Sequence, residues 1–262
     1  MSANQELFEL KFYKWEKEFK DKPYLRQPIG KTWEEYTWGE VGDMARRLAS
    51  GLKSLNLREG AHIGIYSKNC REWIISDLAI VMAGYISVPF FPSLNGKELS
   101  YIMEYGDVDA LFIGKIETWD DIKNELPNEI PIIRFPKYEG CSSVNKGYEW
   151  HEFINSHEPI ENPHHPRLSD LWTIIFTSGT TGNPKGVMLT YQAIDGIKVV
   201  LDDPNNPLGI KHTGNNDFIS YLPLNHIFER VVIEWCSFRY GGTISFVESI
   251  ETFGQNLKDV QP

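Results

Sequence analysis

The chain has 262 residues, of which 41% are hydrophobic and 24% are charged, which is ordinary for a globular protein. Its formal net charge of −10 argues against an extended nucleic-acid-binding face, because such a face needs clustered basic side chains. The cysteines at positions 70, 141 and 236 are widely spaced and odd in number, which fits neither a disulfide framework nor a zinc site. We therefore expect reduced thiols, a cytoplasmic location, no protein-held metal and no nucleic-acid partner.

The first well-marked element in chain order is a helix that begins after Thr37. Thr37 and Glu40 have the spacing of a capping box, and apolar residues then recur every three or four positions up to Leu55. A short strand (62–66), a helix (68–84) and a second strand (85–91) follow. This strand–helix–strand order predicts a parallel sheet.

The stretch from 73 to 92 is the most membrane-like part of the chain. It contains Asp77 and Pro89, and the chain has no uncharged run of 18 residues. A buried helix followed by a core strand is therefore favoured over a membrane span.

Further elements are expected after that unit. Strands are predicted at 110–114 and 132–135, with a helix-compatible segment at 119–126 between them, and a Pro- and His-rich connector follows at 155–170. Later elements are a strand at 186–189, a helix over 191–200 capped by Thr190, and a second βαβ unit. That unit comprises a strand at 217–224, a helix from about 227 to 240, and a strand at 243–247. The predicted fold class is α/β, with mostly parallel sheets flanked by helices.

The segment FTSGTTGNPKG, residues 176–186, follows the apolar run LWTIIF. Its glycines would let successive backbone N–H groups converge on a phosphate, its hydroxyls add donors, and Lys185 adds a positive charge. A surface turn is the alternative, although a turn rarely needs eleven such residues or a core strand leading into it. The predicted phosphate-binding residues are Thr177, Ser178, Gly179, Thr180, Thr181, Gly182 and Lys185.

The order of residues around Lys185 indicates which kind of phosphate loop this is. Pro184 precedes the lysine and Gly186 follows it, unlike in the Walker loop, and the dinucleotide fingerprint is also missing. The motif instead resembles the phosphate loop of the adenylate-forming superfamily, and the resemblance covers essentially the whole chain. YLPLNHIFER at 221–230 resembles the long-chain fatty-acid–CoA ligase branch specifically. One departure is Tyr191, where many members have His.

This resemblance implies a two-step reaction. A carboxylate attacks the α-phosphate of ATP to give an acyl-adenylate and pyrophosphate, and coenzyme A then displaces AMP. The implied ligands are a fatty acid, ATP, Mg²⁺ and coenzyme A, with His226 lining the acyl-carboxylate side of the pocket. His226 is also compatible with a strand-end histidine that bonds only to backbone. Glu229 and Arg230 receive no catalytic role, because the helix dipole alone favours a glutamate in a first turn.

The superfamily's later elements, an aromatic-Gly-x-Thr-Glu segment, a ribose-binding Asp and a catalytic Lys, are not found. We therefore expect the N-terminal part of an acyl-CoA ligase, with no catalytic residue of its own and no activity in isolation. The expected portions are 1–165 (first αβ portion), 166–212 (phosphate-loop hairpin and following helix) and 213–262 (start of the second βαβ portion).

Two alternative functions stay open. One is a stand-alone nucleotide-binding or regulatory module, and the other is a different ATP-using enzyme such as a kinase. The resemblance is also compatible with a homodimer and with peripheral membrane contact.

Overall fold

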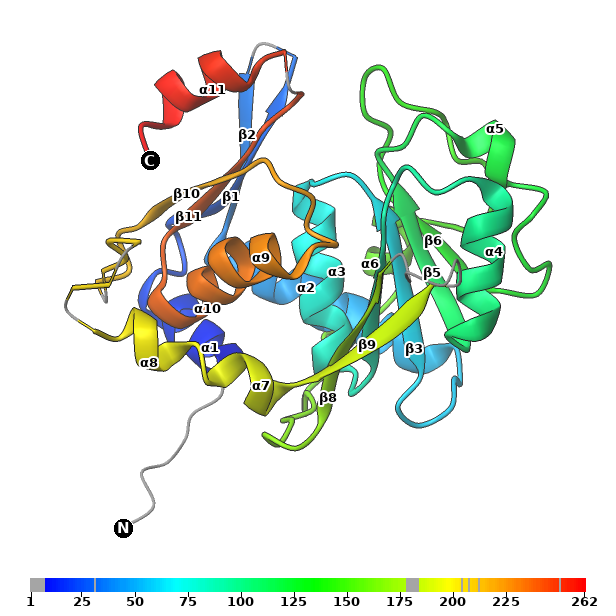
Figure 1. Cartoon of the computed structure of the whole chain (residues 1–262), viewed down its shortest axis with the longest axis horizontal. Helices are drawn as coiled ribbons and strands as arrows, with labels where there is room; N and C mark the ends of the chain where they lie inside the picture. The colour runs from blue at the N-terminus through cyan, green and yellow to red at the C-terminus, as the bar shows by residue number, and fades with distance from the viewer. Residues whose placement is uncertain are drawn as a thin grey trace.

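The chain forms two β-sheets with helices packed between and around them (Figure 1). The computed structural model describes residues 8–30, 32–177, 184–203, 205–206, 208–211, 213–249 and 251–262. The strands are β1 (Pro23–Ile29), β2 (Thr32–Thr37), β3 (His62–Ser67), β4 (Ile86–Phe90), β5 (Val108–Gly114), β6 (Ile132–Arg134), β7 (Tyr148–Glu149), β8 (Leu171–Thr177), β9 (Lys185–Thr190), β10 (Asp217–Ser220) and β11 (Thr243–Phe246). The helices are α1 (Phe8–Glu18), α2 (Trp38–Ser54), α3 (Arg71–Met82), α4 (Gly96–Tyr105), α5 (Trp119–Ile122), α6 (Trp150–Asn155), α7 (Tyr191–Asp195), α8 (Lys198–Leu201), α9 (Ile227–Glu229), α10 (Cys236–Tyr240) and α11 (Phe253–Val260), with a π-helical stretch at Arg230–Trp235.

The larger sheet has the strand order β7-β6-β5-β3-β4-β8-β9. All its neighbouring strands are parallel except β8 and β9, which form an antiparallel pair. The α/β fold class and the βαβ unit of β3, α3 and β4 are thereby confirmed. Strand order reverses between β3 and β5, which makes the carboxyl ends of these two strands the topological switch point of the sheet.

The smaller sheet has the order β10-β11-β1-β2. Strands β10 and β11 are parallel, which confirms the second βαβ unit, and β11 also pairs in parallel with β1. The β1–β2 hairpin was not predicted from the sequence. It joins the beginning of the chain to the end, with Leu25 opposite Ile244. The division of the chain at residues 165 and 212 stays a prediction.

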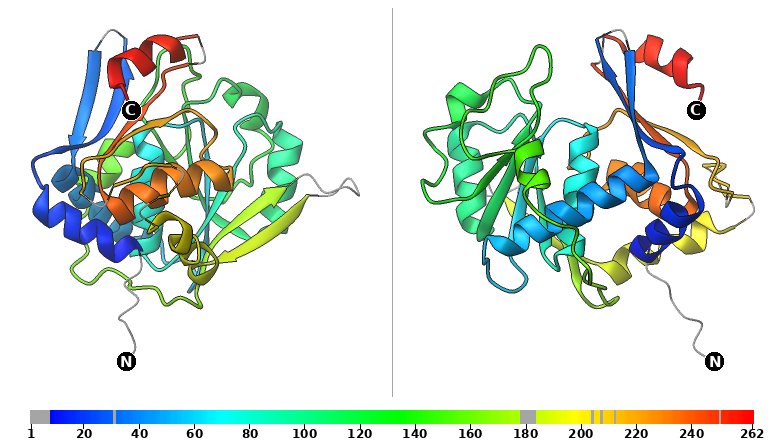
Figure 2. Two further views of the ribbon diagram at one scale, coloured as in Figure 1. Left: turned by 60° about the vertical axis from the view of Figure 1, so that its left-hand side comes forward. Right: turned by 180° about the vertical axis from the view of Figure 1, so that it is seen from behind.

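Helix α3 lies between the two sheets, in contact with β1 on one side and with β3 and β4 on the other. Figure 2 shows α2 beside it, crossing between the two halves of the molecule. All twelve residues of α3 are buried, including Asp77. A helix enclosed on every side needs apolar residues on most of its surface, which explains the membrane-like character of this stretch. In the described ranges, no helix combines the length and apolar character needed to cross a membrane.

Three predicted helices differ from the observed ones. The segment 119–126 is helical only at Trp119–Ile122, and the segment 191–200 is divided into α7 and α8 after Gly196, a poor helix former. The segment from Ile227 to Tyr240 is helical throughout but contains the π-helical stretch. Stretches of this kind occur frequently at functional sites.

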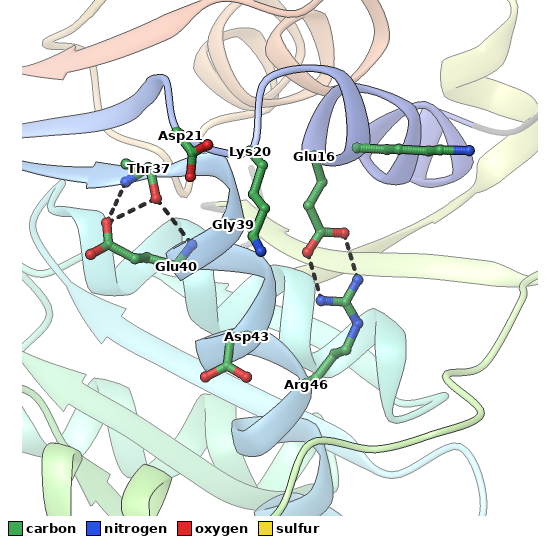
Figure 3. Close-up of a pocket in the computed structure, with 9 residues that line it drawn as sticks. Glu16, Lys20, Asp21, Thr37, Gly39, Glu40, Asp43 and Arg46 are labelled. Atoms are coloured by element: carbon green, nitrogen blue, oxygen red, sulfur yellow. Dashed lines mark hydrogen bonds and ion pairs between the residues drawn. The ribbon is translucent and has the colours of Figure 1, made fainter.

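The capping box at the start of α2 is confirmed and is visible in Figure 3. Thr37 Oγ1 accepts a hydrogen bond from Glu40 N at 3.2 Å, while Glu40 Oε2 accepts one from Thr37 N at 2.7 Å.

We expect Thr37→Ala to lower the free energy of unfolding by about 1 kcal/mol, measured by urea denaturation. Glu40→Gln is the matched control, because glutamine also completes a capping box. Equal losses in the two variants would contradict the assignment.

Candidate functional site

Strands β8 and β9 flank the predicted phosphate-binding motif. They pair in antiparallel register from Leu171–Thr190 to Thr177–Lys185, so the pairing ends where the motif begins. Ser178, Gly179, Thr180, Thr181 and Gly182 lie outside the described residues. Thr177 and Lys185 are both exposed at this end of the pair.

The segment from Tyr221 to His226 lies at the carboxyl end of β3. Asn69, just after β3, binds this segment through its side chain, with Nδ2 2.6 Å from Leu222 O and Oδ1 2.9 Å from Leu224 N. Strand β8 pairs with β4 at Thr173–Ser87. Phe176, beside Thr177, packs against the end of α4, with its ring centroid 6.2 Å from that of Tyr105, just before β5 begins. The flanking residues of the motif therefore lie toward α4 rather than beside the His226 segment.

His226 is exposed and forms the N-cap of α9. Its Nδ1 accepts a hydrogen bond from Phe228 N at 3.2 Å. One ring nitrogen of His226 therefore bonds to backbone, as the alternative interpretation of this residue expects. The role of His226 as a pocket-lining residue stays a prediction.

Glu229 is buried, with only 2% of its surface exposed. Its Oε1 accepts hydrogen bonds from Ser220 Oγ and from Tyr221 N, both at 2.9 Å. Burial raises the pKa of Glu229 to about 7, although these hydrogen bonds favour the charged form and limit the rise. The helix-dipole interpretation from the sequence missed these contacts, because no local pattern links Glu229 to the end of β10.

Arg230 is fully buried at the start of the π-helical stretch. Its guanidinium donates to Asp77 Oδ2 at 2.6 Å, to Thr173 Oγ1 at 2.7 Å and to Glu234 Oε2 at 3.1 Å. It also lies over the Trp172 ring, with 4.0 Å from Cζ to the ring centroid. One side chain therefore connects α3, β8 and the π-helical stretch.

The charges in this network shift one another's pKa values. Burial raises the pKa of Glu234 well above its usual range, the Asp77 charge adds to the rise, and Arg230 opposes it. Burial disfavours the charged form of Arg230, but the nearby Asp77 and Glu234 carboxylates outweigh this and raise its pKa.

A hollow of about 710 Å³ lies on other elements, where the end of α1 meets the beginning of α2 (Figure 3). Its lining is strongly charged and comprises Glu16, Lys17, Lys20, Asp21, Thr37, Gly39, Glu40, Asp43 and Arg46. Arg46 donates to both carboxylate oxygens of Glu16, at 2.7 and 2.5 Å. Arg46 pairs with Glu16 and Glu40 pairs with Thr37 within the hollow, and we assign no ligand to it.

Comparison with known proteins identifies the class to which this site belongs. Residues 12–261 match the family model described as "AMP-binding enzyme", and the chain belongs to this family. It is 31% identical over 247 residues to "Long chain acyl-CoA synthetase 4" of Arabidopsis thaliana, an alignment that covers 86% of this chain and 35% of that protein.

A second Arabidopsis thaliana protein, "Long chain acyl-CoA synthetase 5", is 33% identical over the same shares of the two chains. The chain thus spans about a third of the length of these curated relatives. Among solved structures, an anthranilate CoA ligase in complex with anthranoyl-AMP has a TM-score of 0.82 at 18% identity, covering 98% of this chain and 48% of that one. This last likeness confirms the fold.

Loss of the Arg230 guanidinium should strongly destabilise the protein. Arg230→Leu leaves Asp77 buried without its counter-charge, so we expect a loss of about 3–5 kcal/mol in the free energy of unfolding. Adding Asp77→Asn should restore part of that loss. Arg26→Ala removes the half-exposed Arg26–Glu35 pair and should cost under about 1 kcal/mol. Comparable losses for Arg230→Leu and Arg26→Ala would refute this account of the network.

Glu229 should make stability depend on pH. Its folded-state pKa of about 7 lies above the ordinary 4.5, so its stabilising contribution is fully present below about pH 4.5 and is lost as the pH rises to about 7. Relative to Glu229→Gln, which cannot titrate, the wild type should lose about 3 kcal/mol of unfolding free energy across this window. Chemical denaturation at several pH values measures the difference, and parallel profiles for the two proteins would disprove the assignment.

Proposed function

We propose that this sequence supplies the ATP phosphate-binding loop and the acyl-carboxylate-facing segment of an AMP-forming long-chain acyl-CoA synthetase. The observation that carries the proposal is the antiparallel β8–β9 pair, whose pairing ends where the Gly- and Thr-rich motif begins. The names of the two Arabidopsis thaliana relatives support the choice of a long-chain acyl substrate.

In the proposed reaction, a fatty-acid carboxylate oxygen attacks the α-phosphorus of ATP and pyrophosphate leaves. The thiol of coenzyme A then attacks the acyl carbon of the adenylate, and AMP leaves. Backbone N–H groups and hydroxyls of residues 177–182, together with Lys185, would hold the β- and γ-phosphates. Donors that are already oriented stabilise developing charge without reorganisation. His226 would face the carboxylate.

Magnesium would supply charge neutralisation on the triphosphate. Over the described ranges of the chain, no three His, Cys, Asp or Glu side chains cluster closely enough to hold a metal ion. These residues do not form a metal site of their own, and we propose that the ion enters with the nucleotide.

We also propose a cytoplasmic location for the protein, on the basis of its thiols. Cys70, Cys141 and Cys236 are free. Burial raises the pKa of both Cys70 and Cys236 to about 12, so neither is a reactive thiolate near neutral pH. A homodimer and peripheral membrane contact remain proposals that rest on the family resemblance.

Lys185→Ala should weaken ATP binding to the chain at least about tenfold, because a charge-assisted hydrogen bond to phosphate is lost. AMP affinity should change little, since the lysine is proposed to hold the β- and γ-phosphates. Lys211→Ala, an exposed lysine preceding β10, is the matched control. Titration calorimetry with Mg²⁺–ATP and with AMP measures both affinities. Unchanged ATP affinity in Lys185→Ala would disprove the phosphate-loop assignment.

The reaction class is tested in the whole protein that carries this sequence. Fatty acid, ATP and coenzyme A should together yield AMP, pyrophosphate and acyl-CoA. Chromatography of the reaction mixture measures these three products. Phosphate transfer without AMP release would indicate a kinase instead. The isolated 262-residue chain should bind nucleotide without turning it over, and fatty-acid-dependent pyrophosphate exchange from it would contradict this part of the proposal.

A further inference from the structure

Two residues meet at the topological switch point of the larger sheet. Asn69 follows β3 and Lys115 follows β5, and Lys115 Nζ donates to Asn69 O at 2.9 Å. In open α/β sheets this crevice is the usual ligand position. Here the Asn69 side chain instead extends from it to the polypeptide that follows β10 in the smaller sheet.

The segment after Ser220 has left its sheet, so its backbone groups need other partners. Asn69 satisfies the carbonyl of Leu222 and the N–H of Leu224, and Glu229 satisfies the N–H of Tyr221. Three successive parts of the segment are therefore bound by side chains from outside it. None of these bonds belongs to a regular strand or helix.

Ser220 connects the two side chains. Its Oγ accepts from Asn69 Nδ2 at 2.8 Å and donates to Glu229 Oε1 at 2.9 Å. The three residues form a continuous relay that begins at the larger sheet, passes through the end of β10 and ends on the helix that follows His226. Ser220 and Glu229 are both buried, so water does not compete freely for these bonds.

We propose that Asn69 and Glu229 are positioning residues that together hold Tyr221–His226, and with it the His226 ring, against the carboxyl end of β3. Asn69 suits this role because its amide donates through Nδ2 to one backbone group and accepts through Oδ1 from another. Glu229 Oε1 accepts hydrogen bonds from Ser220 Oγ and Tyr221 N, and a glutamine carbonyl can take its place. Any effect of this positioning on catalysis rests on the proposed function, whereas the placement of Tyr221–His226 by Asn69 and Glu229 does not.

The test measures amide hydrogen exchange in the purified chain. In Asn69→Ala, the informative amides are those of Tyr221 and His226, because neither is bonded to Asn69 itself. In Glu229→Ala, the informative amides are those of Leu224 and His226, which Glu229 does not bind. We expect exchange at these remote amides to accelerate about tenfold or more, the effect of losing roughly one hydrogen bond.

Two controls separate positioning from general destabilisation. Asn216 makes the same kind of bonds, accepting from Lys211 N at 2.9 Å and donating to Lys211 O at 2.8 Å, but it lies at the opposite end of β10. Asn216→Ala should leave exchange in 221–226 unchanged. Glu229→Gln should retain wild-type exchange there, because its carbonyl keeps both bonds.

Unchanged exchange at the remote amides in Asn69→Ala, or equal acceleration in Asn216→Ala, would overturn the proposal. A second measurement distinguishes this failure from that of the proposed function. If exchange behaves as expected but the whole protein forms no AMP with palmitate, ATP and coenzyme A, the positioning role stands and the synthetase assignment fails. If it does form AMP, Asn69→Ala should raise KM for palmitate with little change in KM for ATP.

Discussion

The buried guanidinium of Arg230 is the interaction on which the arrangement of the candidate site depends. It binds Asp77 of α3 and Thr173 of β8 while extending from the π-helical stretch. Thr173 in turn donates to Ser87 O of β4 at 2.8 Å. An unpaired charge at this depth would be strongly unfavourable, so these elements retain one relative placement. The strand that leads into the phosphate-binding motif and the helix that follows His226 are therefore oriented against each other.

The two sheets are also joined through polypeptide that is distant in sequence. Strands β1 and β2 pair with β11, so the beginning of the chain completes the sheet formed by its end. At the other junction, Asn69 bridges from the larger sheet to the segment after β10. The second connection places the His226 segment, whose backbone has few local hydrogen bonds.

Several features could be predicted from local sequence alone. The capping box of Thr37 and Glu40, the strand at 62–66 and the buried helix after it depend on contacts within a few residues or on apolar runs. The β1–β2 hairpin was missed because β2 is largely exposed and lacks a regular apolar pattern. The π-helical stretch was not predicted from the sequence, and Arg230 at its start binds Asp77 and Thr173, which stand far away along the chain.

The candidate site divides in the same way. By itself the sequence predicts phosphate binding at the motif, since small residues, hydroxyls and Lys185 stand in that order, and this stays a prediction. It also determined the fold class, because strand and helix periodicities are local. Only the tertiary structure decided that Asn69, Glu229 and Arg230 support the His226 segment. Tyr221, Leu224 and Asp77, which these side chains bind, lie 8 to 155 residues away from them along the chain. Because buried polar groups need hydrogen-bond partners, burial makes these distant contacts necessary.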